Sequence, residues 1–212
     1  MRTKECRSRQ ATGFTLSELL VSVACVLLLA VILLPALARS KARSSKVGCI
    51  NNLKQVGIAF HLWSTDNQGK FPMRVPAANG GTLELIGNGT VFPHFQVLSN
   101  ELAGPRDLVC PNDEKKSPAA NFIVGFSDRN LSYFLGLDAA KEDGSSPLSG
   151  DRNLTNNTPF GGGVLLDVTP NLPLGWGKDL HSGKANLCFG DGSTKQVQNG
   201  FVVSGTNRFA LP

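Results

Sequence analysis

The sequence contains few of the residues from which metal and catalytic sites are usually built. It has three histidines (His61, His94 and His181), and no two of them stand at the spacing of paired metal ligands. Its five cysteines include no C-x-x-C motif, so the pattern predicts no zinc site. A nucleophile elbow, a phosphate-binding loop and a catalytic carboxylate pair are also absent. We therefore expect a protein that is not an enzyme and has no catalytic or cofactor-binding residue.

A basic patch is missing as well, although the net charge is +5. Eight of the 21 basic residues flank an apolar segment, four before Gly13 and four between Arg39 and Lys46. From Val47 onward, 13 basic residues are balanced by 14 acidic ones. Cationic side chains beside an apolar segment are typical of contact with lipid head groups. The charge distribution therefore indicates the lipid bilayer as a partner, and no nucleic acid.

The apolar segment runs from Phe14 to Ala38 and contains one charged residue, Glu18. A helix of its 25 residues is about 37 Å long, which is enough to cross a bilayer. The segment is too long for the apolar core of a secretory signal peptide, and no small-residue cleavage site follows a short core. A carboxylate at the bilayer centre costs about 2–3 kcal/mol, so Glu18 needs a partner. A cut between Gly13 and Phe14 would supply one, since the new α-amine would lie four residues from Glu18 at a helix N-terminus.

The stretch GFTLSELL, with the basic residues before it, resembles the processing signal of type IV prepilins. The resemblance implies that a prepilin peptidase cuts after Gly13 and methylates the amine of Phe14. It also implies that Glu18 pairs with the amine of a neighbouring subunit during assembly. The resemblance also implies that the leader faces the cytoplasm, which sets the orientation of the membrane helix. The charges alone leave this orientation open, because four basic residues lie on each side of the apolar segment. Pro35 is expected to kink or locally open the helix.

Apolar residues continue beyond the membrane segment at spacings of three and four, which predicts one helix that extends to about Asp66. TDNQGKFP predicts its end, because Gly69 suits a left-handed cap and Pro72 cannot prolong a helix. Short apolar pieces then indicate brief strands and loops, namely TLELI, HFQVL, NFIVGF, LSYFLGL and GGGVLLDV. KANLCF and STKQVQ around GDG predict a hairpin. The polar stretch KEDGSSPLSGDRN predicts an exposed loop.

The soluble part resembles a bacterial group of prepilin-like proteins marked by a histidine, nine residues and Asp-Gly. Here these are His181, Asp191 and Gly192. The segments CINNLKQVGIAFHLWSTDNQGKFP, CPND and GDRNL fit the same group. The resemblance gives His181 no role. The residues alone favour a structural hydrogen bond at the start of a strand, with a catalytic base as the alternative, and Asp191 is most simply a turn residue.

Two further sites follow from residue types. Cys49, Cys110 and Cys188 lie in the part expected outside the cytoplasm, where disulfides persist. We favour a bond between Cys49 and Cys110, because CPND is turn-like and Cys188 lies within a predicted strand; three unpaired cysteines are the alternative. Weak calcium candidates stand in a Gly- and Ser-rich region, with a solvated acidic loop as the alternative; they are Asp138, Asp143 and Asp151.

Together these observations predict an α+β protein of pilin-like architecture, whose long N-terminal helix, with a membrane half and a soluble half, packs on a small antiparallel sheet with long loops. The expected segments are a leader peptide (residues 1–13), a transmembrane helix (14–38), the soluble half of the helix (39–66) and a globular ectodomain (67–212).

By resemblance, the chain is a pseudopilin of a type II secretion-like system or a subunit of a type IV pilus-like filament. It would cross the inner (cytoplasmic) membrane once, hold its ectodomain outside the cytoplasm and be extracted into a filament. The expected partners are copies of itself, other pilin-like subunits, prepilin peptidase and an inner-membrane assembly platform. The alternative is a membrane-anchored enzyme or ligand-binding module that uses the same anchor.

Overall fold

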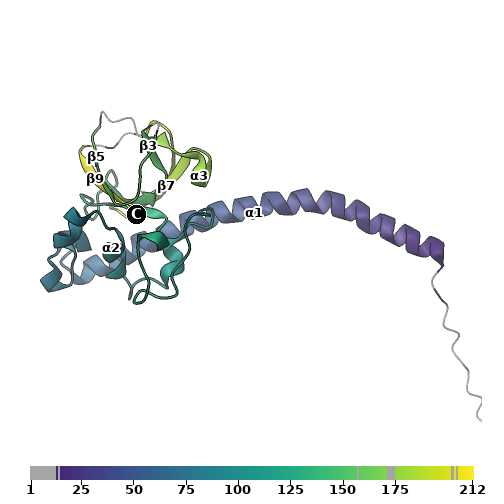
Figure 1. Ribbon diagram of the computed structural model, residues 1–212, viewed down its shortest axis with the longest axis horizontal. Helices are drawn as coiled ribbons and strands as arrows, with labels where there is room; N and C mark the ends of the chain where they lie inside the picture. Colours follow the sequence, from purple (N-terminus) through teal and green to yellow (C-terminus); the bar gives the residue numbers. More distant parts are fainter. Residues whose placement is uncertain (1–12, 14, 157, 171–174, 202, 204) are drawn as a thin grey trace, which may run out of the picture. The chain divides into compact units, whose positions relative to one another are not determined.

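The structure is a computed structural model that describes residues 13, 15–156, 158–170, 175–201, 203 and 205–212. Residues 1–12 of the expected leader, and Phe14, lie outside the described residues. The chain forms two compact units, Met1–Arg43 and Ser44–Pro212. Helix α1 (Leu16–Asp66) begins in the first unit and ends in the second (Figure 1).

The first part of α1 is apolar over most of its surface. The stretch Leu16–Pro35 is long and apolar enough to cross a membrane, with a mean hydropathy of 2.7 and no part of it buried inside the protein. A continuous apolar surface of this length is typical of contact with lipid. The helix continues through Pro35, so it is not opened there, and the expected kink stays a prediction. One missing backbone hydrogen bond does not interrupt a helix of 51 residues.

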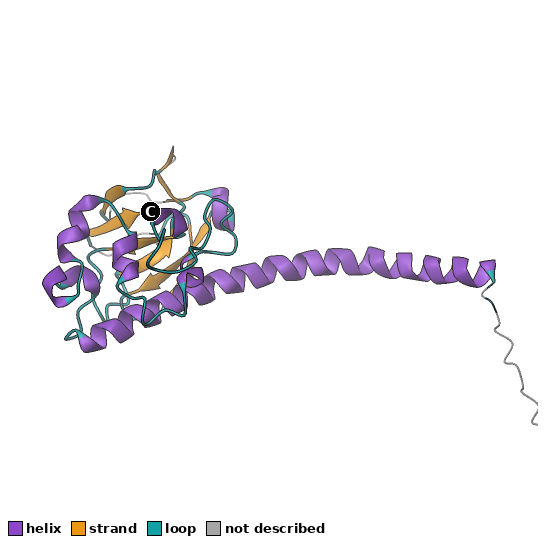
Figure 2. Cartoon of the chain, turned by 60° about the horizontal axis from the view of Figure 1, so that its bottom comes forward, coloured by secondary structure: helices purple, strands orange, loops and turns teal. Residues whose placement is uncertain are grey.

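The second unit contains a six-stranded antiparallel sheet in the order β5-β9-β1-β2-β7-β8. Figure 2 shows the strands of this unit in orange. Its strands are β5 (Val164–Val168), β9 (Asn207–Leu211), β1 (Tyr133–Gly136), β2 (Pro147–Asp151), β7 (Lys184–Phe189) and β8 (Thr194–Gln198). A smaller antiparallel sheet consists of β4 (Thr158–Pro159), β3 (Leu154–Asn156) and β6 (Gly175–Trp176). The α+β class is therefore confirmed.

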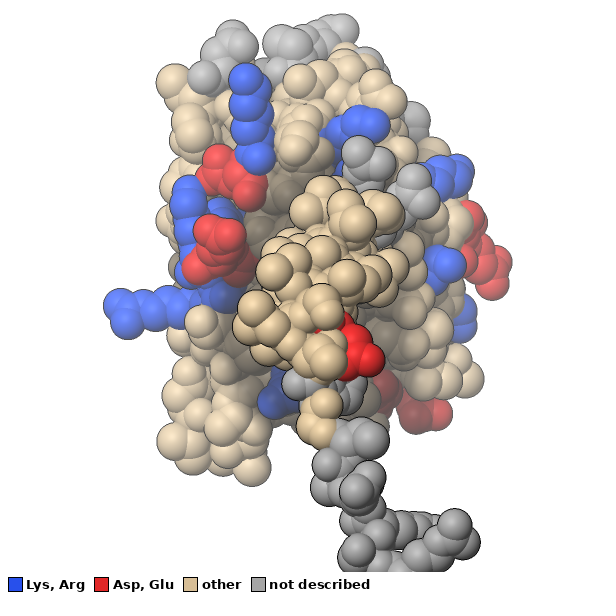
Figure 3. Space-filling model, turned by 90° about the vertical axis from the view of Figure 1, so that its right-hand side faces the viewer, with Lys and Arg blue, Asp and Glu red and all other residues tan. Residues whose placement is uncertain are grey.

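Short helices lie between α1 and β1, and one lies between β6 and β7. Two are α-helical, α2 (Phe92–Gln96) and α3 (Lys178–His181). The others are 3-10 turns at Pro72–Arg74, Ala77–Asn79, Leu83–Asn88, Pro105–Leu108 and Asp128–Asn130. On the face shown in Figure 3, basic and acidic side chains are interspersed rather than gathered by sign. This face therefore lacks the basic patch of a nucleic-acid-binding surface.

The large sheet has an apolar core on each face, because successive residues of a strand point to opposite sides. On one face lies the second part of α1, through fully buried side chains that include Cys49, Leu53, Val56 and Phe60. The other face buries Phe134 and Phe209, whose rings stack with centroids 4.6 Å apart, together with Trp176 of the small sheet. Both sides of the central strands are thus closed to water.

The structure corrects three expectations about single segments. KEDGSSPLSGDRN is not wholly an exposed loop, since its second half forms the fully buried strand β2. TLELI and HFQVL fall in short helices rather than strands, and NFIVGF is irregular, with the Ile123 side chain 86 % exposed. The hairpin was predicted correctly, as β7 pairs with β8 from Lys184↔Gln198 to Cys188↔Thr194.

His94 in α2 is a buried titratable group within the first core. Its Nδ1 lies 2.6 Å from Oγ1 of Thr82, and its Nε2 has no partner among the described residues. Burial lowers the pKa of the His94 imidazole from 6.5 to about 4. The folded chain therefore disfavours the charged imidazole.

We predict that this histidine makes the protein acid-sensitive. Because the folded pKa lies below the unfolded one, the stability that neutral His94 provides is complete above pH 6.5 and is lost as the pH falls towards 4. The loss should reach about 3 kcal/mol at pH 4. Urea unfolding of the unmodified chain and of His94→Asn, whose amide can still face Thr82, measures the difference. Parallel pH profiles for the two proteins would contradict the prediction.

Candidate functional site

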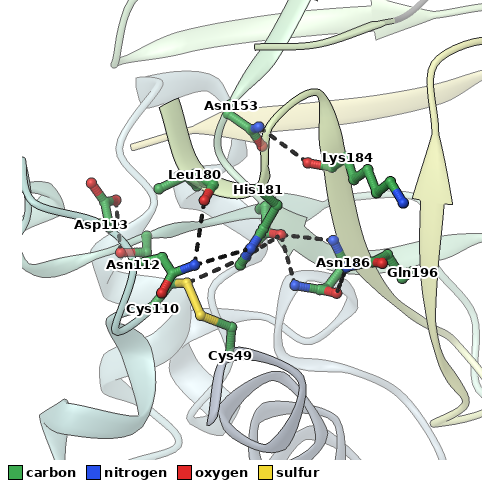
Figure 4. A network of polar contacts seen from close by, with 12 residues as sticks. Cys49, Cys110, Asn112, Asp113, Asn153, Leu180, His181, Lys184, Asn186 and Gln196 are labelled. Carbon is green, nitrogen blue, oxygen red and sulfur yellow. Dashed lines mark hydrogen bonds and ion pairs between the residues drawn. A yellow bond between two sulfur atoms is a disulfide. The ribbon is translucent and has the colours of Figure 1, made fainter. Parts of the chain in front are cut away.

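Segments that are far apart in the sequence meet at one buried place (Figure 4). CPND follows the 3-10 turn Pro105–Leu108, GDRNL begins in β2, and His181 ends α3 just before β7. A disulfide joins Cys49 on α1 to Cys110, with the two Cα atoms 4.9 Å apart. Cys49, Cys110, His181 and Asp151 are together called the Cys–His cluster below.

The disulfide is the pair favoured from the sequence. It joins residues 61 positions apart and, in the loop-entropy description, stabilises the fold by about 4 kcal/mol. It ties α1 to the CPND turn, where a side chain on Gly48 would meet the ring of Pro111 at 3.3 Å. Cys188 stays a free, buried thiol on β7. The bond therefore fixes α1 to a segment that belongs to no strand of the sheet.

His181 is 4 % exposed and makes three polar contacts. Nε2 lies 3.3 Å from Oδ2 of Asp151 and 3.5 Å from Sγ of Cys110, and Nδ1 lies 3.5 Å from Nδ2 of Asn112. The Asn112 amide and the Asp151 carboxylate therefore face opposite nitrogens of the imidazole ring. Burial lowers the pKa of the His181 imidazole, and the positive charge of Lys46 lowers it further. The buried imidazole is therefore favoured in its neutral form.

Asp151 is fully buried at the end of β2. Its Oδ2 accepts hydrogen bonds from the backbone N–H and the side-chain Nδ2 of Asn186, at 2.7 and 3.0 Å. Its Oδ1 has no hydrogen-bond partner among the described residues. Burial raises the pKa of the Asp151 carboxyl to about 7, although the bonds from Asn186 act in the opposite direction. One oxygen of this carboxylate is thus buried without a partner among the described residues, while the other faces the imidazole.

The two residues after Asp151 form hydrogen bonds with neighbouring segments of the chain. Arg152 donates to both carboxylate oxygens of Asp113 at 2.7 Å, and Ser132 donates to Oδ2 at 2.8 Å. Burial by itself raises the pKa of the Asp113 carboxyl, but the bonds from Arg152 and Ser132 outweigh it and hold that pKa below its usual value. Asn153 donates to the carbonyls of Gly177 and Lys184, at 2.8 and 3.3 Å.

The second half of the histidine motif lies elsewhere. Asp191 and Gly192 form the turn between β7 and β8, so they are at the opposite end of β7 from His181. Asp191 Oδ1 accepts from the N–H of Ser193 at 2.8 Å, and Gly192 has a φ of 80°. A side chain on Gly192 would meet His61 of α1 at 3.3 Å. The motif therefore marks the two ends of one strand, not one site.

The weak calcium candidates are held by different partners. Asp138 makes a bidentate pair with Arg208, with contacts of 3.0 and 2.7 Å. Asp143 accepts from the backbone and hydroxyl of Ser145, at 2.9 and 2.6 Å. Asp151 belongs to the Cys–His cluster. Among the described residues, the one group of three or more potential metal ligands is Cys49, Cys110 and His181, so the three aspartates do not form a shared site there.

The sequence pattern assigns no role to Asn112, Asp113 or Arg152. CPND contains the acidic Asp113 and GDRNL the basic Arg152, so their opposite charges could have suggested a pair. Nothing in the spacing of the two motifs indicates that these side chains meet. The favoured structural role of His181 agrees with its burial between hydrogen-bonding groups. The side chains of the cluster are all buried.

Comparison of the chain with protein-family models, with curated proteins and with solved structures finds no match.

We predict that the buried pair Asp113–Arg152 matters far more for folding than the exposed pair Lys115–Asp179. Arg152→Met should lower the free energy of unfolding by about 3 kcal/mol, because it leaves Asp113 charged, buried and unpaired. Lys115→Met, the matched control, should cost less than about 1 kcal/mol. Urea denaturation at pH 7 measures both.

A double variant tests whether the lost stability comes from the unpaired charge of Asp113. Asp113→Leu together with Arg152→Met should recover much of the lost stability, since an apolar pair leaves no buried charge. Equal losses for Arg152→Met and Lys115→Met would contradict the prediction.

Proposed function

We propose that the chain is a prepilin-like structural subunit, a pseudopilin of a type II secretion-like system or a subunit of a type IV pilus-like filament. The observation that carries this proposal is helix α1. Its first part is an exposed apolar span, and its second part is buried in the core of a separate globular unit. A single helix shared between lipid and a folded domain suits a subunit that packs through its anchor.

The N-terminal residues support the same proposal. The stretch GFTLSE leads into the first turn of α1. Gly13 lies before the helix, and a side chain added at Gly13 would have no other atom of the described residues within 4 Å of its Cβ, its chain neighbours aside. Helix α1 begins at Leu16, which follows the expected cleavage position in the sequence. The disulfide between Cys49 and Cys110 fits an oxidising compartment for the globular unit. In this proposal the partners are copies of the chain, related subunits, prepilin peptidase and a membrane assembly platform.

Cleavage tests the proposal first. We expect that co-expression with a prepilin peptidase removes residues 1–13 and leaves a methylated Phe14 as the first residue. Mass spectrometry of the purified chain measures this. Cells without the peptidase provide one control, and a Gly13→Leu variant provides the other. An intact N-terminus in the presence of an active peptidase would contradict the proposal.

Glu18 has a second role that bears on its use in assembly. Its Oε2 accepts from the N–H and the hydroxyl of Thr15, at 2.9 and 2.8 Å, and the Glu18 N–H faces Thr15 Oγ1 at 3.3 Å. This is a capping box at the start of α1, and the T-x-x-E spacing in the sequence is its signature. Loss of Glu18 therefore removes a helix cap as well as a charge.

Two substitutions distinguish these roles. Glu18→Gln keeps an acceptor for Thr15 but removes the charge that would pair with a neighbour's amine. We expect normal membrane insertion and folding of this variant with loss of filaments, measured by membrane fractionation and electron microscopy. Glu18→Ala should also lose assembly and destabilise the start of α1 by about 1 kcal/mol. Normal filament yield from Glu18→Gln would rule out the charge pairing.

A further inference from the structure

The Cys–His cluster has the composition of a metal site. The sulfur atoms of Cys49 and Cys110 and a ring nitrogen of His181 all lie within 4.8 Å of one another. Oδ2 of Asp151 lies 3.3 Å from Nε2 of the same imidazole. Two thiolates, an imidazole and a carboxylate are ligands that zinc accepts in four-coordinate sites. The sequence did not predict this site, because its members are brought together only by the fold.

Two of the distances between these atoms match those of a tetrahedral ion. With Zn–S near 2.3 Å and Zn–N or Zn–O near 2.0–2.1 Å, a tetrahedron places sulfur about 3.5 Å from nitrogen and nitrogen about 3.3 Å from oxygen. The corresponding distances here are 3.5 Å between Cys110 Sγ and His181 Nε2, and 3.3 Å between Nε2 and Asp151 Oδ2. The two sulfur atoms are covalently bonded, and the Asp151 carboxylate lies outside the group of atoms within 4.8 Å of one another, so it must move closer to the sulfur atoms when an ion binds. In the reduced chain the distance between the two sulfur atoms must open to about 3.8 Å.

Two neighbouring groups support a ligand at this place. Asp151 Oδ1 is buried and has no partner among the described residues, which is costly unless something binds it. The Asn112 amide faces His181 Nδ1 at 3.5 Å. When its oxygen and nitrogen exchange places, the amide accepts a hydrogen bond from Nδ1–H, as the outer partners of metal-bound histidines do.

We propose that the reduced chain binds one thiophilic divalent cation of the zinc type through Cys49 Sγ, Cys110 Sγ, His181 Nε2 and the Asp151 carboxylate. Metal binding and the disulfide are then alternative states of one site. Both states join α1 to the CPND turn. The metal would hold this connection in a chain that has not yet been oxidised. The inference does not depend on the proposed function.

The chemistry of the two states balances. A phosphine reductant and one water convert the disulfide into two thiols and a phosphine oxide. Zn²⁺ then displaces one proton from each thiol and forms two Zn–S bonds. An external disulfide reverses the process by taking two electrons from the thiolates, which restores the bond between Cys49 and Cys110 and releases the ion.

Titration of the full-length chain in detergent micelles tests the proposal. A Cys6→Ser, Cys25→Ser background removes the cysteines outside the globular unit, and anaerobic phosphine treatment reduces the disulfide. We expect reduced protein to bind one Co²⁺ per chain with the visible bands of tetrahedral coordination, and Zn²⁺ to displace it. The oxidised protein should bind none at this site. His181→Ala should weaken binding at least about 100-fold, and Asn112→Ala about 10-fold.

The control is Cys49→Ser with Cys110→Ser, which keeps Cys188. Binding by the reduced chain that is no tighter than binding by this control would overturn the proposal, as would unchanged affinity in His181→Ala. Unchanged affinity for the metal ion in Asp151→Asn would show that Asp151 is not the fourth ligand. Near-ultraviolet circular dichroism follows the fold. If reduction abolishes the native signal, Zn²⁺ must restore it in the parent chain and not in His181→Ala, and failure to do so counts against the site.

Discussion

The close packing of the second part of α1 against the large sheet is the constraint on which the globular unit depends. A side chain at Gly57 would lie 2.6 Å from the Cys188 sulfur on β7, so the helix can approach the strand only where it has a glycine. Cys49, Leu53, Val56 and Phe60 then lose all contact with water. At about 25 cal/mol per Å² of buried apolar surface, side chains of this size contribute about 1.5–3 kcal/mol each. The sheet, its hairpin turn and the disulfide are all arranged around this contact.

The buried polar residues explain how irregular segments are held beside that core. Asp151, Arg152 and Asn153 are consecutive, yet their side chains reach Asn186, Asp113 and the carbonyl of Gly177 respectively. Each contact belongs to a different segment of the chain. Because an unpaired buried charge is costly, such a network favours one arrangement of the loops over others that would bury the same apolar area. The GDRN segment therefore specifies the fold more than it stabilises it.

Local signals predicted the parts of the structure that local forces determine. The spacing of apolar residues and the TDNQGKFP stop placed the end of α1, and Asp191-Gly192 placed the hairpin. The prediction failed for β2, because Ser149 and Asp151 look solvent-exposed in sequence but are buried, and they form hydrogen bonds with Phe134 and Asn186 on neighbouring strands. It could not foresee the Cys–His cluster either. Cys110 and His181 are 71 residues apart, and only the order of the strands brings them together.

The position of the disulfide along α1 also determines how the protein transmits force. A pull on the N-terminal end of α1 reaches the globular unit at Cys49, in the first turns of the part that packs on the sheet. From there the load passes through a covalent bond to Cys110 and on towards β1. Residues 50–109 are bypassed by this path. The part of α1 after Cys49 would therefore remain packed on the sheet under tension, because the disulfide bears the load in place of its apolar contacts.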